Sequence, residues 1–422
     1  MLKRKFFYWL TISNFLYIIV LLILAGITIS ALSGENGILT RASESKEKTE
    51  KEQEKEQLQL AILDSQIEDV NTSEIKKESL ENAIKNQFGE NKDFLVTDNK
   101  DGSFLVNMND TQRIYYIDEI GSIIDKILKI STVDELKEFR DDVNSGNTYE
   151  GWYVYLANDI ILDSNENWEP IGVYQEESTN PDDVTNIPFK GIFNGNFNTI
   201  SEMHTDSTKK NRGLFGLIKE STIKNVGIVD GDIQGTSRTG AIVGYAYKNS
   251  KIKNCYNLSN INCTNNFVGG IAGFINDEII IENCYNAGNV TSNMNSVGGI
   301  VGGINHSTIK NCYNTGMIGG NYVGGISGEA YVDALIENCY NTGILKSTTL
   351  AASINCSKSS LVTFKNNYYL ENTINGANDI YPIEECKVKN SEAMKELYTI
   401  LGKSYEKDIN NINNGYPILT WQ

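Results

Sequence analysis

The block Val268-Gly269-Gly270-Ile271-Ala272-Gly273 is followed by the block Asn283-Cys284-Tyr285-Asn286, and this pair of blocks recurs along the chain. The glycine block returns as Val297-Gly298-Gly299-Ile300-Val301-Gly302 and as Val323-Gly324-Gly325-Ile326-Ser327-Gly328. The cysteines of the second block, Cys255, Cys284, Cys312 and Cys339, are 29, 28 and 27 residues apart. Self-similarity at a near-constant period of this length is the signature of a repeat architecture.

Weaker copies precede these repeats. Thr239-Gly240-Ala241-Ile242-Val243-Gly244 keeps the glycine pattern, and Val226 stands 29 residues before Cys255. Because a free cysteine behaves as a small hydrophobe, its exchange with Val indicates that the thiol fills space in a core. The four cysteines are therefore predicted to form a structural ladder of thiols. Pairing of neighbouring cysteines stays open, since turns about 4.8 Å apart are within disulfide reach.

The repeat unit carries no helical periodicity and is rich in Ile, Val, Tyr, Asn and Gly, which predicts short strands joined by tight turns. One such unit cannot bury its own apolar side, so successive units must stack. The predicted fold is mainly β, a right-handed parallel β-solenoid. Ile252 and Cys255 are an odd number of residues apart, so both can point inward only if the chain bends at Asn254. The equivalent residues are predicted to stack as an amide ladder: Asn254, Asn283, Asn311 and Asn338.

These blocks resemble the GLUG-type repeats of secreted and surface proteins of bacteria, including the non-catalytic N-terminal regions of IgA-cleaving metallopeptidases. The resemblance covers about the C-terminal two thirds of the chain and includes Phe193-Asn194-Gly195-Asn196 and the terminal Asn414-Gly415-Tyr416-Pro417. It implies a β-solenoid and a surface location. It does not bring the peptidase activity, because neither His204 nor His306 belongs to a His-Glu-x-x-His motif.

Composition narrows the function classes. The 422-residue chain has a formal net charge of −17, which argues against a nucleic-acid partner. Its two histidines leave little room for general-base or metal chemistry, and no phosphate loop, nucleophile elbow or paired-cysteine zinc motif is present in the sequence. We therefore expect no cofactor, no metal and no enzymatic activity.

The N-terminus predicts a membrane anchor. Lys3, Arg4 and Lys5 precede an uncharged run over residues 6–32, which is long enough to span a bilayer. Residues 1–33 are predicted to form a single-pass anchor in the cell membrane, with the C-terminal region extracellular by the positive-inside rule. A cleaved signal peptide stays open as the alternative.

Residues 19–54 resemble the N-terminal segment of prepilin-like proteins of Gram-positive, clostridia-type bacteria, in Val20-Leu21-Leu22-Ile23-Leu24-Ala25-Gly26 and in Gly34-Glu35-Asn36-Gly37. The resemblance implies a pilin-like region after the anchor. The pattern departs from a prepilin leader because no glycine precedes Phe6. Processing by a prepilin peptidase is therefore not expected.

The segment after the anchor predicts a small α+β region. Residues 34–70 form a charged helix or stalk, and its apolar stripe of Leu60, Leu63, Ile67 and Val70 packs either on its own domain or in a coiled coil. Residues 71–128 form a pilin-like α+β domain, with a helix over 74–88 that opens on a capping box of Asn71 and Glu74. Strands are predicted over 94–97, 103–108 and 113–117.

Residues 131–390 form the predicted solenoid, with short helices at both ends. Thr132 and Glu135 make a capping box for a helix over 132–144, whose face of Leu136, Phe139 and Val143 covers the first turn. Residues 391–422, with a helix over 391–401 and a last strand over 416–421, are predicted to cap the other end.

Two ladders are candidates for function. Tyr256, Tyr285, Tyr313 and Tyr340 each follow a cysteine, and they form either an exposed surface for a sugar or partner, or a buried aromatic stack. Lys253, Glu282, Lys310 and Glu337 share one repeat position and are predicted to pair across neighbouring turns rather than to form a catalytic carboxylate pair.

The sequence thus predicts a cell-surface binding or adhesion protein, attached to the membrane through residues 6–32, with an extracellular glycan or protein as ligand. One alternative is a structural subunit of a pilus-like or type II secretion-like assembly. The other alternative is a carbohydrate-active β-helix enzyme, since parallel β-solenoids with clustered carboxylates also host such chemistry.

Overall fold

The computed structural model describes residues 38–67, 74–175, 180–356, 361–375 and 386–422. The chain forms two compact units, Met1–Ile123 and Ile124–Gln422. The predicted anchor over 6–32 lies outside the described residues, so the anchor and its topology stay predictions. Of the helices within the described ranges, none is both long and apolar enough to cross a membrane.

The first unit is a small α+β domain. It contains α2 (Ile38–Ile67), α3 (Lys77–Phe88) and a four-stranded sheet in the order β1-β2-β3-β4. The strands are β1 (Phe94–Asp98), β2 (Phe104–Met108), β3 (Arg113–Ile117) and β4 (Ile123–Ile124). The first three pair antiparallel, at the places where strands were predicted. Likeness to a pilin stays a prediction.

The predicted apolar stripe of α2 was wrong. Leu60, Leu63 and Ile67 are exposed, and Val70 lies outside the described residues. The face that packs against α3 and the sheet instead carries Leu58, Ala61, Ile62 and Ser65. Both rows have helical spacing, but only the second row is covered by the apolar residues of α3 and of the sheet. The helix therefore packs on its own domain, which was one of the two predicted alternatives, and the coiled coil was the other.

The start of α3 also differs from the prediction. The helix begins at Lys77, and its N-cap residue Lys76 makes no side-chain capping hydrogen bond. Glu74 lies in the extended segment before it, and Asn71 lies outside the described residues. The predicted capping box is therefore not the start of this helix.

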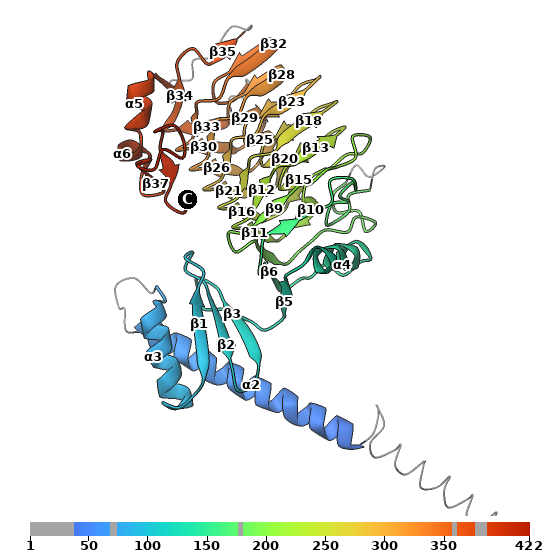
Figure 1. Ribbon diagram of the computed structural model, residues 1–422, viewed down its shortest axis with the longest axis vertical. Helices are drawn as coiled ribbons and strands as arrows, with labels where there is room; N and C mark the ends of the chain where they lie inside the picture. The colour runs from blue at the N-terminus through green and yellow to red at the C-terminus, as the bar shows by residue number, and fades with distance from the viewer. Residues whose placement is uncertain (1–37, 68–73, 176–179, 357–360, 376–385) are drawn as a thin grey trace, which may run out of the picture. The chain divides into compact units, whose positions relative to one another are not determined.

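The second unit is a parallel β-solenoid of about eight turns (Figure 1). The strands of successive turns line up in four sheets, which we number by their order around a turn. Sheet 1 contains β5 (Ile127–Ile130), β6 (Tyr153–Leu156), β8 (Ile192–Asn194), β11 (Thr222–Lys224), β16 (Lys251–Lys253), β21 (Ile280–Glu282), β26 (Thr308–Lys310), β30 (Ala334–Glu337) and β33 (Val362–Lys365). Sheet 2 contains β7 (Ile160–Ile161), β9 (Thr199–Ser201), β12 (Gly227–Val229), β17 (Tyr256–Asn257), β22 (Tyr285–Asn286), β27 (Tyr313–Asn314), β31 (Tyr340–Asn341), β34 (Asn367–Leu370) and β36 (Cys386–Lys389).

The glycine blocks and the strands before them form the other two sheets. Sheet 3 contains β13 (Asp232–Gly235), β18 (Asn260–Cys263), β23 (Val290–Ser292), β28 (Ile318–Gly324), β24 (Val297–Gly298), β19 (Val268–Gly269), β14 (Thr239–Gly240), β32 (Leu345–Ala352) and β35 (Ile374–Asn375). Sheet 4 contains β10 (Phe215–Lys219), β15 (Val243–Tyr247), β20 (Ala272–Asn276), β25 (Val301–Asn305) and β29 (Ser327–Ala330). One continuous apolar core lies inside the four sheets.

The bend between sheets 1 and 2 lies at the predicted asparagines. Asn254 has φ +52° and Asn283 has φ +53°, and the equivalent residues of the other turns have similar values. Asparagine tolerates this left-handed conformation, which turns the chain so that both Ile252 and Cys255 point into the core. Hydrogen bonds connect much of the amide ladder, for example from Asn311 Nδ2 to Asn283 Oδ1 at 3.2 Å. The prediction of a bend at this residue is confirmed.

The helix α4 (Val133–Asn144) covers the first turn of the solenoid. Thr132 and Glu135 form the predicted capping box, with Glu135 N donating to Thr132 Oγ1 at 3.2 Å. Leu136, Phe139 and Val143 are buried in the solenoid core, as predicted. Phe139 packs edge-on against Phe189, with ring centroids 5.7 Å apart. The helix therefore closes this end of the stack.

The C-terminal segment lies elsewhere than predicted. The expected helix over 391–401 is two short helices, α5 (Ser391–Lys395) and α6 (Tyr398–Leu401), and β37 (Tyr405–Glu406) pairs antiparallel with β38 (Ile418–Leu419). These elements pack along the side of sheet 2 rather than over the end of the solenoid (Figure 1). The physical reason is the tyrosine face of sheet 2, which offers this segment an aromatic surface to bury.

Candidate binding surfaces of the solenoid

The cysteine ladder lies in the core. Cys255, Cys284, Cys312 and Cys339 are free thiols and completely buried. The thiol of Cys284 donates to the backbone oxygen of Glu282 at 3.2 Å, and burial raises its pKa. Val226 occupies the equivalent place and is equally buried. The thiols therefore fill volume at this position, where an apolar side chain also fits.

A second asparagine ladder was missed by the sequence reasoning. It consists of the last residue of each Asn-Cys-Tyr-Asn block: Asn257, Asn286, Asn314 and Asn341. All four are completely buried, and Asn286 Nδ2 donates to Asn314 Oδ1 at 2.8 Å. The second glycine of each Gly-Gly pair lies against this ladder, where a side chain would overlap the amide. The signal was in the sequence, because the glycine pairs and these asparagines share one period.

The tyrosine ladder is a column of stacked rings. Neighbouring rings of Tyr256, Tyr285, Tyr313 and Tyr340 are 4.9 to 5.1 Å apart, with planes within 5° of parallel. The column starts at Tyr256 because Gly227 stands before it, and a Cβ there would overlap the Tyr256 ring.

The C-terminal segment covers this ladder. Tyr313 is 2 % exposed and Tyr340 is completely buried, while Tyr256 and Tyr285 are half-buried. Trp421 lies 5.9 Å from the Tyr285 ring, and its Nε1 donates to the backbone oxygen of Asn283 at 3.0 Å. Burial raises the pKa of Tyr285 and of Tyr340. Of the two alternatives for this ladder, the structure shows the packed one, and Tyr313 and Tyr340 are inaccessible to a ligand.

The charged ladder on sheet 1 pairs as predicted at its centre. Glu282 lies between two lysines, with Lys310 Nζ at 2.8 Å and Lys253 Nζ at 3.8 Å from its carboxylate. Strand register places Glu337 next to Lys310 on the following turn. Alternating charges of this kind stabilise the sheet modestly.

The outer face of sheet 4 carries a second set of aromatic side chains, which the sequence reasoning did not single out. We call it the aromatic row: Tyr174, Tyr245, Tyr247, Phe267, Phe274 and Tyr331. Tyr245 and Phe274 are register partners on β15 and β20, with ring centroids 5.7 Å apart. Phe274 in turn lies 4.9 Å from Phe267 and 6.3 Å from Tyr331. The row therefore runs across several turns of the solenoid.

A left-handed residue before three of the glycine blocks supports this row. Arg238, Phe267 and Ser296 hold equivalent positions, with φ between +51° and +64°. Arg238 and Phe267 reach the sheet 4 residue of their own turn, whereas Ser296 reaches that of the following turn. The guanidinium of Arg238 lies 5.0 Å from the Tyr245 ring, Phe267 packs on Phe274, and Ser296 Oγ donates to Glu329 Oε2 at 2.6 Å. The signal that could have found the row is the residue after the last glycine of each block, which varies from Tyr245 to Phe274 to Gly303.

The two halves of the aromatic row differ in exposure. Tyr174, Tyr245 and Tyr247 are at most 8 % exposed. Asp182 covers this half. Its carboxylate pairs with Lys219 at 2.6 Å and with Lys248 at 2.9 Å, and these contacts lower the pKa of Asp182. Phe267, Phe274 and Tyr331 are only partly buried. A hydrophobic surface is thus accessible at the second half only.

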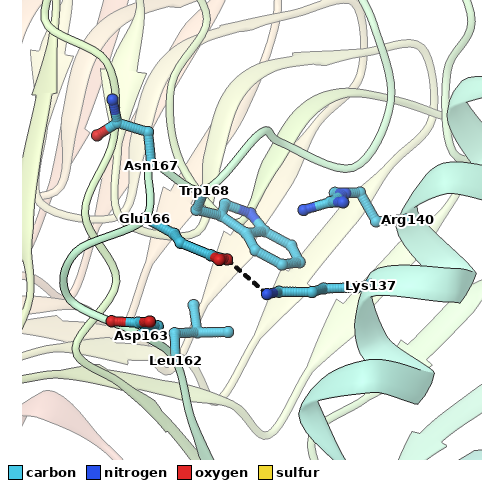
Figure 2. Close-up of a pocket in the computed structure, with 7 residues that line it drawn as sticks. All are labelled: Lys137, Arg140, Leu162, Asp163, Glu166, Asn167 and Trp168. Carbon is cyan, nitrogen blue, oxygen red and sulfur yellow. Dashed lines mark hydrogen bonds and ion pairs between the residues drawn. The ribbon is translucent and has the colours of Figure 1, made fainter.

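A small cavity lies between α4 and the segment before β8 (Figure 2). Its volume of about 20 Å³ suits about one water molecule. Lys137 Nζ pairs with Glu166 at 2.6 Å across it, and the guanidinium of Arg140 lies 4.9 Å from the Trp168 ring. These contacts attach the end helix to the first turns and leave no room for a larger ligand.

The histidines do not come together with other ligands. His204 Nδ1 lies 3.0 Å from the backbone oxygen of Glu202, and His306 Nε2 lies 3.8 Å from Asp333. Over the part of the chain that the structure describes, no group of three or more His, Cys, Asp or Glu side chains is placed to hold a metal ion.

Comparison with known proteins agrees on the fold. No protein-family model and no curated protein matches the sequence. The crystal structure of a candidate immunoglobulin A1 protease from Bacteroides ovatus is similar over 70 % of this chain and 92 % of its own, with a TM-score of 0.55 and 21 % identity. A structure described as an IgA1 protease aligns over 71 % of this chain and 25 % of its own, at a TM-score of 0.35 and 13 % identity. The similarity to the Bacteroides ovatus structure shows that this fold also occurs in a protein described as a candidate immunoglobulin A1 protease.

Proposed function

We propose that the solenoid is a non-catalytic binding module of a cell-surface binding or adhesion protein, and that it binds its partner through the outer face of sheet 4. The observation that carries the proposal is the half-exposed second half of the aromatic row, formed by Phe267, Phe274 and Tyr331. Aromatic side chains are enriched where proteins bind partners, because a rigid ring buries a large area at a low entropic cost.

Backbone strain at Phe267 supports the same surface. The residue has φ +64°, a conformation that bulky side chains rarely adopt. Arg238 and Ser296 have the same conformation at the equivalent positions, and asparagine or glycine would adopt it at a lower cost. Phenylalanine at residue 267 therefore costs more conformational free energy than asparagine or glycine would. In return, it adds an aromatic surface beside Phe274.

Phe267→Asn with Tyr331→Ser tests the proposal. Asparagine relieves the strain at residue 267, so the variant is expected to fold while it loses two rings of the surface. Phe197→Asn is the matched control, because Phe197 is also a partly exposed ring at φ +62° but lies beside Trp421. Binding of the intact protein to arrays of glycans and of extracellular proteins should weaken in the double variant and persist in the control. Equal binding by both variants would contradict the assignment of this surface.

The remaining parts of the function follow from the sequence. The anchor over residues 6–32 would hold the module at the membrane with the solenoid outside, and N-terminal sequencing of the mature protein tests it. A mature start near Ser33 would contradict the anchor. A pilus-like subunit would instead show processing and polymerisation through the N-terminal region.

An enzymatic role is the competing function. The related structure from Bacteroides ovatus is described as a candidate immunoglobulin A1 protease, and other β-solenoids act on polysaccharides. Incubation of the purified protein with immunoglobulin A1 and with acidic polysaccharides separates these roles. Specific cleavage of either substrate would contradict a purely binding function.

A further inference from the structure

The first half of the aromatic row already binds cations, and these cations belong to the chain itself. The guanidinium of Arg238 lies 5.2 Å from the Tyr174 ring and 5.0 Å from the Tyr245 ring. The ammonium groups of Lys219 and Lys248 lie 5.9 and 5.2 Å from the Tyr247 ring. Asp182 completes the arrangement by pairing with both lysines. In this half, the face of sheet 4 therefore accommodates positive charge in two ways. Cationic groups lie over aromatic rings, and a carboxylate pairs with the two lysines.

The second half has the same components without the cation. Phe274 and Tyr331 continue the row, and within the described ranges no Lys or Arg lies over either ring. The turns that follow these strands stack on one another, through Asp277 N to Asn305 O at 3.3 Å and His306 N to Val332 O at 2.8 Å. In the first half these turns carry Lys248, whereas here they carry carboxylates: Asp277, Glu278 and Asp333.

Glu329 adds a further carboxylate on the sheet itself. Strand register pairs Phe274 with Gly303 and Gly303 with Glu329, so Glu329 lies two strands from Phe274 on the same ladder. Burial and a hydrogen bond to Glu329 raise the pKa of Tyr331, so its ring stays neutral at physiological pH. Tyr331 is thus bordered by the carboxylate of Glu329, and the turns that follow the strands of this half carry further carboxylates.

Resting on the binding role proposed above, we infer that the second half of the aromatic row takes a basic peptide segment of a partner protein. Arg or Lys side chains of that segment would lie over Phe274 and Tyr331, as Arg238 lies over Tyr245. Carboxylates of Asp277 and Asp333 would neutralise them, as Asp182 neutralises Lys219. A cation over an aromatic face is favoured electrostatically, and the net charge of −17 adds long-range attraction for a basic partner.

The test uses the intact protein and a fluorescein-labelled hexa-arginine peptide, with hexa-glutamate and neutral oligosaccharides as comparison probes. Asp277→Asn with Asp333→Asn removes the turn charges, and both residues have φ between +47° and +70°, which asparagine tolerates. The matched control is Glu202→Gln with Asp230→Asn, which makes the same charge change at exposed turn positions with φ +58° and +52°. This control removes the general effect of an acidic protein on a basic peptide.

The first double variant should weaken hexa-arginine binding by roughly fivefold relative to the control. Tyr331→Leu should weaken it by about two- to fivefold, whereas Tyr155→Leu, at a partly buried tyrosine on sheet 1, should not. Equal affinity of the two double variants overturns the inference. Binding of a neutral oligosaccharide at this face, lost in the Phe267→Asn and Tyr331→Ser variant but unchanged by the charge variants, also overturns it while the binding role stands. If no probe class depends on this face, the binding role itself fails.

Discussion

The side-chain amide of Asn286 lies directly against Gly270, so closely that a Cβ on Gly270 would overlap the Asn286 side chain. Asn286 is completely buried and links Asn257 to Asn314 through hydrogen bonds of 2.8 Å. The second glycine of the pair, at Gly270, Gly299 and Gly325, therefore leaves space for a buried amide of the ladder. A buried amide without its partners costs free energy, so the glycine and the ladder depend on each other.

Gly270→Ala is expected to destabilise the solenoid by about 3 kcal/mol, because the added methyl group overlaps both Asn286 and the backbone oxygen of Gly299. Gly319→Ala is the matched control, since its Cβ would meet nothing closer than Thr291 Cγ2 at 3.4 Å. Urea unfolding followed by circular dichroism measures both. Equal midpoints for the two variants would show that the close approach is not a constraint.

Cys284→Val is expected to change the free energy of unfolding by less than about 1 kcal/mol, because Val226 already fills the equivalent place two repeats earlier. The completely buried thiols of Cys284 and Cys339 should also resist alkylation in the native protein, since burial raises their pKa. Mass spectrometry after iodoacetamide treatment measures this. Rapid labelling of these thiols under native conditions would contradict a closed core, and the urea-unfolded chain supplies the fully labelled reference.

Stability is expected to fall in alkaline solution. Burial raises the pKa of Tyr245 to about 12 and raises that of Tyr285 and Tyr340 as well, whereas an unfolded tyrosine ionises near 10. Below pH 10 both states are protonated and the full stability is present. As the pH rises from about 10 to about 12, only the unfolded state releases these protons, so folding becomes less favourable.

The urea midpoint between pH 8 and pH 12 checks this expectation, together with tyrosinate absorbance of the native protein. Tyr245→Phe should show a shallower decline, because one of the buried phenols is gone. A pH-independent midpoint, with native tyrosines ionising near pH 10, would contradict the burial of this set.

Trp421→Ala is expected to cost about 3 kcal/mol and to release the C-terminal segment from sheet 2. The indole packs on Tyr256 and Tyr285 and donates to the backbone oxygen of Asn283. Trp421→Phe keeps the ring and loses only the hydrogen bond, so it should cost about 1 kcal/mol. Limited proteolysis reports the release, as cleavage near residues 403–411 before the solenoid is cut. Unchanged proteolysis of Trp421→Ala would show that the other contacts hold the segment without the indole.

The sequence by itself determined the repeat part of the fold. Each turn of a solenoid packs mainly against its neighbours, so the pattern within a repeat of about 28 residues already contains most of the contacts. This is why the thiol ladder at Cys284, the bend at Asn254 and the pairing of Glu282 with Lys310 could be predicted. The capping box of Thr132 and Glu135 is local in the same sense.

Tertiary structure alone decided which surfaces remain open. Helix α2 has two apolar rows, and only its packing partners select the row of Leu58 over that of Leu60. Residues 404–422 cover the tyrosine ladder through contacts with residues up to 165 positions away (Trp421 with Tyr256, 421−256), which no repeat period encodes. The aromatic row likewise joins Tyr174 and Tyr245, which are 71 residues apart, and Arg238 packs on both rings. Such contacts depend on which distant side chains meet in space, and that is fixed only when the whole unit has folded.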